Sequence, residues 1–437
     1  MRWVSRVPLL LRQRHHIRRS SPAARLEPRR TSLPHGRTAV VRTATRSVLP
    51  PQLVLAGIAT SIAITFNMLL PVVPVLVERR GPHGAAGAAT AALFIGAVAG
   101  ELLTPWLMSR WSSWGLLVAG QLMTAVPSLV YVMPRPDATL MLAAAAARGL
   151  GMGVAIVVAV ALVAELTPPD RRGRAIGYFG LALSAPGIVL PSVAVSLLEA
   201  SRVDIDALVA FTVGLGGALL AFMLPRTSTS GVSSSLLHAL RQPGLLLIFA
   251  GFVMVSSSFG AVITFAPVAL PTAGAGSAAV FLFVAGSARA ATRWLAGVLG
   301  DRRPGRLVLA GGVGLTLAGL VALGVRSNPA VVLVAGLAFG GGYGAVQTAA
   351  YLAMTARGTS DHRNTISALW NSGIDLGASL GGSLLGLTAA RFGYSTAIWV
   401  IPVVVLLALP VLLAPARAVP AGGRASEMIE PAGAIGP

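Results

Sequence analysis

Twelve apolar runs separated by short polar loops are the feature that most constrains how this chain of 437 residues can fold. A helix that crosses a bilayer needs ~20 predominantly apolar residues, and each run is close to that length. The chain is 55% hydrophobic and 11% charged, with a mean hydropathy of +0.77, whereas a soluble domain carries about 25% charged residues. None of the runs alternates like the strands of a membrane β-barrel. The sequence therefore predicts an all-α, multi-pass membrane protein with spans at residues 52–77, 87–109, 115–133, 139–165, 175–198, 207–224, 244–270, 277–300, 307–325, 330–356, 365–390 and 395–415.

The net charge of +20 indicates orientation in the membrane rather than a nucleic acid partner. Basic residues are all arginine, and 12 of the 34 precede residue 51. The loops before spans 3, 5, 7, 9 and 11 hold 11 arginines, and the loops before the even-numbered spans hold 6. Because arginine is enriched on the cytoplasmic side, both termini are predicted to be cytoplasmic in a protein of the plasma membrane.

The chain divides into two halves of six spans each. Equivalent features recur at a constant offset of 192 residues, which maps Glu101 onto Arg293 and Ser109 onto Asp301. Parallel repeats of this kind are a transporter architecture. The predicted organisation is a disordered arginine-rich segment (1–50), a first six-helix bundle (51–224), a cytoplasmic connector (225–243), a second six-helix bundle (244–415) and a cytoplasmic tail (416–437).

Three motifs resemble those of the major facilitator superfamily. Gly297-x-x-x-Asp301-Arg302, followed by Gly305-Arg306, resembles its signature between spans 8 and 9. The run Arg148-Gly149-Leu150-Gly151-Met152-Gly153 is similar to the span-4 signature of its proton-coupled drug and metabolite exporters, whereas Pro186-Gly187 matches their span-5 motif only in part. The resemblance covers roughly residues 50–415. It implies twelve transmembrane helices in two pseudo-symmetric six-helix bundles that alternate access to a shared cavity.

A charged gate is predicted at the end of span 8. Asp301 lies beside Arg302, and a carboxylate there can hold a helix N-terminus or an arginine and so stabilise one closed arrangement of the halves. The first half carries Ser109 at the equivalent position, which cannot supply that charge. The predicted gate residues are Gly297, Asp301, Arg302, Arg306, Arg110, Arg171 and Arg172.

Two ionisable residues deep in predicted spans are candidates for proton or substrate coupling. Arg148 lies about 14 Å into span 4 and Asp375 about 16 Å into span 11, at a rise of 1.5 Å per residue. Charged groups at such depth are costly and are usually functional. A carboxyl group removed from water takes up a proton more readily, which suits a proton carrier. The competing interpretation of each is a structural partner for backbone carbonyls, an arginine or a helix end.

The resemblance also implies which spans meet. It places span 2 against span 11 and span 5 against span 8, so Glu101 is expected near span 11 and Arg293 near span 5, with Arg289 as a further interface residue. In the superfamily that the chain resembles, spans 1, 4, 7 and 10 line the cavity, so the same spans are expected to line it here. The predicted polar residues of the cavity wall, beside Arg148, are Thr65, Asn67, Ser257, Tyr343 and Gln347. Gly336, Gly340 and Gly344 recur every four residues in span 10, a spacing that allows close helix packing.

The sequence predicts a proton-coupled secondary transporter that exports a small lipophilic or amphipathic molecule as a monomer in membrane lipid. It has no nucleotide-binding or metal-binding motif and no credible catalytic set, so no cofactor, metal or enzymatic activity is expected. An importer of an organic anion or nutrient with the same fold is the main alternative. A non-transporting membrane sensor is a third.

Overall fold

The computed structural model describes residues 49–168, 171–225, 243–300, 305–357 and 363–413. Helices account for nearly all of these residues, and no strand occurs among them. The first half contains α1 (Pro51–Leu69), α2 (Val72–Arg80), α3 (Ala85–Met108), α4 (Ser113–Ala125), η1 (Val126–Val132), α5 (Ala138–Leu166), α6 (Arg172–Ser184), α7 (Pro186–Glu199) and α8 (Val203–Ala221). The second half contains α10 (Pro243–Ala269), α11 (Ala278–Gly300), α12 (Gly305–Val325), α13 (Pro329–Thr355), α14 (Arg363–Phe392), α15 (Tyr394–Ala397) and α16 (Val400–Leu413).

Prolines divide spans 1 and 5 into consecutive α-helices, and in span 3 Pro127 lies where α4 passes into the 3-10 helix η1. Span 1 breaks between α1 and α2 at Leu70-Pro71, and span 5 breaks between α6 and α7 at Ala185-Pro186. Proline has no N–H to donate to the preceding turn, so the helical ladder is interrupted where it occurs. Pro71 and Pro191 are buried, where packed protein surrounds the weakened backbone. Both breaks adjoin the cavity described below.

Ten spans in the described part of the chain are long and apolar enough to cross a membrane by length and composition alone. The remaining two of the twelve predicted spans are α11 and α14. They carry the polar and charged residues Arg289, Arg293, Ser372 and Asp375 at membrane depth, which lowers their hydropathy. Both helices pack against the opposite half, so their polar positions face protein instead of lipid. The twelve-helix, two-bundle prediction is confirmed.

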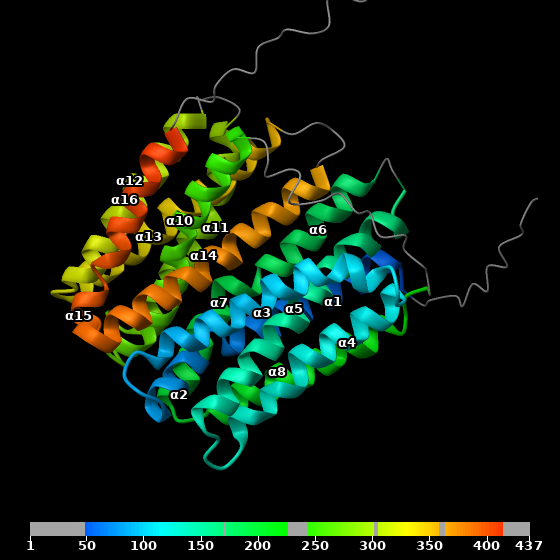
Figure 1. Cartoon of the computed structure of the whole chain (residues 1–437), viewed down its shortest axis with the longest axis horizontal. Coiled ribbons are helices and arrows are strands. Elements are labelled where there is room, and N and C mark those ends of the chain that lie inside the picture. The colour runs from blue at the N-terminus through cyan, green and yellow to red at the C-terminus, as the bar shows by residue number, and fades with distance from the viewer. Residues whose placement is uncertain (1–48, 169–170, 226–242, 301–304, 358–362, 414–437) are drawn as a thin grey trace, which may run out of the picture. The chain divides into compact units, whose positions relative to one another are not determined.

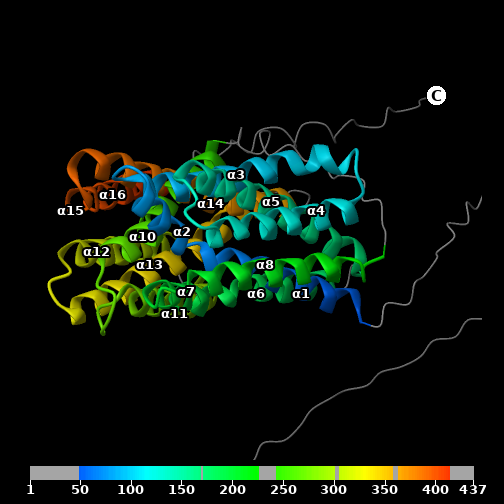
Figure 2. The same cartoon turned by 90° about the horizontal axis from the view of Figure 1, so that it is seen from below.

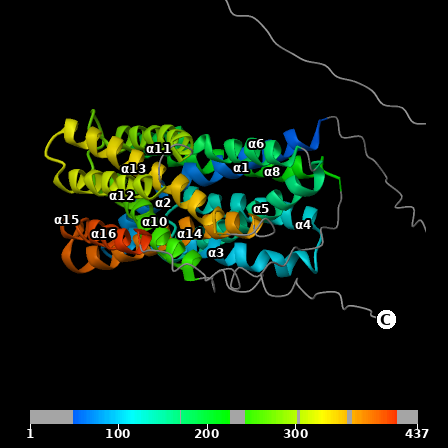
Figure 3. The same cartoon turned by 90° about the horizontal axis from the view of Figure 1, so that it is seen from above.

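Each half is held together by long helix pairs. In the first half α3 and α4 pack on α5, and α1 packs on α8; in the second, α11 and α12 pack on α13, and α10 packs on α14 and α16. Figure 1 shows α14 and α7 running between the two groups of helices. The views from below and above likewise separate α12, α13 and α16 from α4, α5 and α8 (Figures 2 and 3).

The halves meet mainly through two equivalent contacts, α3 with α14 and α7 with α11, and α10 adds smaller contacts with α2 and α3. The two main contacts join spans 2 and 11 and spans 5 and 8, as the resemblance implies. Glycines make the first contact close: a Cβ atom added to Gly87 would collide with the backbone carbonyl of Gly382. The hydroxyls of Thr90 and Thr264 also meet across the halves, 2.5 Å apart. These contacts lie toward the face that bears the loop at Gly84, opposite the face where α1 begins and α16 ends.

Candidate functional site

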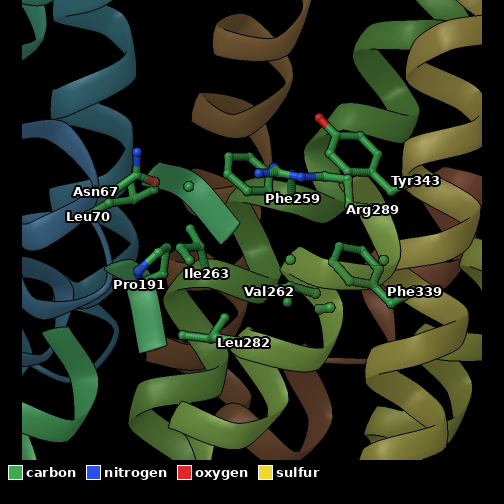
Figure 4. A pocket seen from close by; sticks show the side chains of 14 residues that line it. Asn67, Leu70, Pro191, Phe259, Val262, Ile263, Leu282, Arg289, Phe339 and Tyr343 are labelled. Atoms are coloured by element: carbon green, nitrogen blue, oxygen red, sulfur yellow. The ribbon is translucent and has the colours of Figure 1, made fainter. Parts of the chain in front are cut away.

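A cavity lies where five helical segments from both halves converge. Its volume is about 40 Å³, room for a few water molecules, since each needs about 10–15 Å³. A larger ligand therefore requires the surrounding helices or side chains to move. Figure 4 shows the lining, which consists of Asn67, Leu70, Gly187, Pro191, Phe259, Val262, Ile263, Leu282, Ala285, Gly286, Arg289, Phe339, Gly340 and Tyr343.

The first half contributes the ends of two interrupted helices. Asn67 lies on the last turn of α1, just before the break at Pro71, and its Nδ2 donates to the Ala63 carbonyl at 2.8 Å. Gly187 lies directly after the break between α6 and α7. A Cβ atom at Gly187 would be 3.4 Å from both Asn67 Oδ1 and Arg289 Nη2. Glycine at this position thus leaves the space in which groups from the two halves approach each other.

The second half contributes a wall of aromatic rings. Phe259 of α10 stacks on Tyr343 of α13 with centroids 5.7 Å apart and an interplanar angle of 10°. Phe339, one turn earlier on α13, continues the stack at 6.0 Å and 8°. The resulting wall is aromatic, and Tyr343 OH contacts Ser256 Oγ at 3.5 Å.

Glycines on α13 place this wall beside α11. A Cβ atom at Gly340 would collide with the Ala285 carbonyl, and one at Gly344 would collide with the Arg289 carbonyl. Close backbone approach therefore accounts for the four-residue glycine spacing in span 10. It also brings Arg289 level with Tyr343.

Arg289 is the charged residue of the cavity lining. Its guanidinium carbon lies 5.5 Å from the centroid of the Phe259 ring. Figure 4 shows the Arg289 side chain, which comes from α11, running from beside Tyr343 toward Phe259, with Asn67 on the opposite wall. Sequence reasoning assigned Arg289 to the interface of the halves and did not single out Phe259 or Phe339. The four-residue spacing of Phe339 and Tyr343 was the available signal, since it puts both rings on one helix face.

The other predicted cavity residues lie outside this lining. Thr65 Oγ1 donates to the Ala210 carbonyl at 3.2 Å, and Ser257 Oγ donates to the Met254 carbonyl at 2.7 Å. Gln347 is buried, and its side-chain Oε1 has no hydrogen-bond partner among the described residues. Of the five predicted wall residues, the structure brings Asn67 and Tyr343 to the cavity.

Arg148 is enclosed within the first half and is 1% exposed. Its Nη2 donates to the Thr65 carbonyl at 2.8 Å, and its guanidinium carbon lies 5.9 Å from the centroid of the Tyr131 ring. Its Nε atom has no hydrogen-bond partner among the described residues. Arg148 therefore joins α5 to α1 and η1, and it does not line the cavity described above.

Two acidic residues, Glu101 and Asp375, lie where α3 packs on α14. Ser372 Oγ donates to Glu101 Oε2 at 2.5 Å. Asp375 lies three residues beyond Ser372, on the same face of α14, and interacts electrostatically with Glu101. The contact of Glu101 with span 11 is the one that the resemblance implied.

Arg293 also contacts α14. Its guanidinium carbon lies 5.5 Å from the centroid of the Trp370 ring, in place of the expected approach to span 5. Two turns earlier on α11, Gly286 packs against Ile188 of span 5. Trp370 Nε1 in turn donates to the Gln347 carbonyl at 2.9 Å, which ties α14 to α13.

The predicted gate is described only in part. Asp301 and Arg302 lie outside the described residues, while Gly297 lies in the last turn of α11 and the exposed Arg306 lies in the first turn of α12. In the first half, Arg110 lies 4.3 Å from the centroid of the Trp106 ring. Arg171 is exposed, and Arg172 Nε donates to the Thr167 carbonyl at 3.1 Å. The gate role of these residues stays a prediction.

Comparisons with known proteins agree with the fold. A bacterial homolog of the human lysosomal transporter Spinster, crystallised inward-facing and unoccupied, is similar with a TM-score of 0.65 and 14% identity, over 83% of this chain and 95% of that one. The nucleoside transporter NupG is similar with a TM-score of 0.64 and 11% identity, over 83% of this chain and 98% of that one. A D-xylose-proton symporter is similar with a TM-score of 0.62 and 15% identity, over 82% of this chain and 96% of that one.

These likenesses show the fold alone, and they give no support to the closer resemblance to drug exporters. No curated protein sequence matches the chain. The sequence profile of the Major Facilitator Superfamily matches residues 55–358 and 278–433. Together the two matches span nearly all of the twelve predicted helices and indicate a transporter rather than an enzyme. The chain belongs to the major facilitator superfamily.

Proposed function

We propose that this protein is a proton-coupled secondary transporter that exports a small amphipathic molecule across the plasma membrane by alternating access. The observation that carries the proposal is the carboxylate pair Glu101 and Asp375 at the contact between halves. Two ionised carboxylates in a site shielded from water repel each other, and uptake of one proton relieves that repulsion. Because the pair spans α3 and α14, its protonation is linked to the separation of the halves.

The packing of the halves supports a state that is closed on one face. Toward the loop at Gly84, glycine contacts join α3 to α14, and the His83 ring lies 5.1 Å from the Tyr394 ring. Toward the other face, span 5 continues as α6, which packs mainly against α1, while α7 is the part that packs against α11. The distribution of arginine in the sequence favours a cytoplasmic position for the second face. The described arrangement therefore suits an inward-facing state with both termini in the cytoplasm.

Flux measurements in inverted vesicles test the coupling. With a panel of amphipathic compounds and an imposed pH gradient, we expect gradient-driven accumulation by the native protein. Asp375→Asn is expected to abolish accumulation while retaining exchange of substrate in the absence of a gradient. Asp204→Asn is the matched control, because Asp204 is an exposed acid paired with Arg202. Gradient-independent flux by the native protein, or full coupling in Asp375→Asn, would contradict the proposal.

Import of an organic anion is the second candidate function. The arginine in the cavity suits an anionic substrate, and the direction of transport is tested separately. The same compounds in right-side-out vesicles separate the two directions. Export predicts that an acidic lumen drives accumulation in inverted vesicles. Import driven by a proton predicts accumulation in right-side-out vesicles with an acidic exterior. A protein that moves nothing in either preparation would instead favour a sensor.

A further inference from the structure

Arg289 is a cation at membrane depth that lacks a protein counter-ion. Among the residues that the structure describes, no carboxylate pairs with it, and its side chain donates no hydrogen bond. The two ion pairs found there, His83 with Glu78 and Arg202 with Asp204, involve loop-proximal residues. Charged residues within membranes usually pair with one another or with backbone carbonyls. Arg289 departs from that rule.

The buried acids do not neutralise Arg289. Glu101 accepts a hydrogen bond from Ser372, and the electrostatic partner of Asp375 is Glu101, not an arginine. The nearest basic neighbour on the helix, Arg293, lies four residues away on the same face and adds positive charge. Part of the cost is offset by the rings of Phe259 and Trp370, over which the two guanidinium groups lie. A full negative charge is still missing.

The donors around Arg289 are arranged for an anion that touches both halves. The guanidinium offers several N–H groups in a planar fork, the geometry that binds carboxylates in two places. Asn67 faces it across Gly187, with Oδ1 at 3.4 Å and Nδ2 at 3.6 Å from the Cβ position of that glycine. Its Nδ2 uses one N–H on the Ala63 carbonyl, so the second N–H is a donor beside the Oδ1 acceptor. Asn67 belongs to the first half and Arg289 to the second. An anion bound between them therefore connects the two bundles.

The remainder of the cavity wall is apolar and in part aromatic. The rings of Phe259, Tyr343 and Phe339 are nearly parallel, with interplanar angles of 10° and 8°. An aromatic wall of this kind favours packing by an aromatic group. The combination of an unpaired guanidinium with an aromatic stack suits one ligand class: an anionic head group attached to a flat apolar body.

We infer that Arg289 is the specificity-determining residue of the cavity and that the substrate is an aromatic organic anion, held by Arg289 and Asn67 at its head and by the Phe259–Tyr343–Phe339 stack along its body. This inference rests on the proposed transport function but not on its proton coupling or direction. Replacement of Arg289 by a neutral residue removes the reason to prefer an anion.

The test compares three compounds that share one ring system: 2-naphthoate, neutral 2-naphthamide and cationic 2-naphthylmethylammonium. Binding to the purified full chain in lipid nanodiscs is measured by isothermal titration calorimetry without a proton gradient. We expect the native protein to bind 2-naphthoate at least about tenfold more tightly than the amide, as befits a charge-assisted bidentate contact. The cation is expected to bind most weakly.

Variants separate specificity from folding. Arg289→Gln is expected to bind 2-naphthoate and 2-naphthamide equally while retaining its affinity for the amide, which shows that the cavity is intact. Arg289→Lys is expected to recover only part of the preference, since lysine lacks the planar fork. Arg202→Gln is the control, because Arg202 is an exposed arginine paired with Asp204.

Equal or weaker binding of 2-naphthoate than of the amide by the native protein, or an unchanged preference in Arg289→Gln, would overturn the inference. The inference would also be overturned if none of the three compounds bound to the native protein. Because no gradient is applied, a failure of proton coupling in the vesicle experiment leaves this result unaffected. Gradient-driven flux of neutral or cationic compounds in preference to anions would overturn the inference and leave the proposed coupling standing.

Discussion

At the scale of single residues, the two deeply placed arginines differ in their surroundings. Arg148 is sealed against a backbone carbonyl and a tyrosine ring within one half, while Arg289 lies in a cavity shared by both halves. A buried cation with few partners costs stability unless it is compensated. The Arg148 contact with the Thr65 carbonyl connects α5 to the helix that carries Asn67, so it supports the first-half wall of the cavity.

Arg148→Met tests whether this arginine is kept for stability. Methionine fills a similar length without a charge, and removal of a poorly compensated buried charge is often neutral or stabilising. We expect a melting temperature within about 5 °C of the native protein, together with a roughly tenfold loss of transport, as for functional intramembrane charges. Thermal unfolding in detergent and vesicle flux are the two measurements. Native transport with a large drop in melting temperature would instead identify Arg148 as structural.

At the scale of helices, small residues determine how near two helices approach, both between the halves and within the second half. Gly87 and Gly382 bring α3 and α14 into backbone contact, and Gly340 does the same for α13 and α11. The breaks at Pro71 and Pro186 then bring the end of α1 and the start of α7 to the cavity, and α7 packs on α11. The cavity thus results from two features: glycine contacts that bring neighbouring helices close together, and the interrupted helices at Pro71 and Pro186 that end beside it.

Gly87→Val is expected to favour separation of the halves on the face that bears Gly84. Its added side chain would collide with the backbone of α14, and overpacking of this kind typically costs about 1–3 kcal/mol. A single cysteine introduced at Ile263, in a chain that contains no other cysteine, reports access from that face to an impermeant maleimide. We expect faster labelling and slower transport.

Gly311→Val is the matched control for Gly87→Val. Gly311 is also a helix-interior glycine, but a Cβ atom there meets no atom within 4 Å. Its labelling and transport are expected to equal those of the Ile263→Cys background. If both glycine variants changed labelling equally, closure by the Gly87 contact would be refuted.

At the scale of the whole molecule, alternating access requires contacts on one face to break in each cycle. Thr90 and Thr264 come from different halves, and their hydroxyls meet. Oxidation of the double variant Thr90→Cys/Thr264→Cys is expected to form a disulfide that reduces transport to background, with recovery after addition of a reductant. Each single variant transports normally under the same treatment. Full transport by the crosslinked protein would exclude opening at this position.

Much of the architecture was predictable from sequence. The twelve spans, the repeat of six helices and the helix breaks at Pro71 and Pro186 all follow from local properties, namely hydropathy, periodicity and the missing N–H of proline. The contact of Glu101 with span 11 followed from the resemblance to the superfamily. These features depend on residues near one another in sequence or on a fold shared across a large family.

The composition of the cavity was decided by tertiary structure. Arg289 was expected at the interface and lines the cavity; Thr65, Ser257 and Gln347 were expected in the cavity and lie outside its lining. The approach of Asp375 to Glu101 was not foreseen either. Which side chains meet depends on the rotation, crossing and bending of each helix, and those follow from glycine contacts distant in sequence. The sequence by itself determined a two-bundle membrane transporter, and only the packing of its helices decided which charges face the cavity and which face one another.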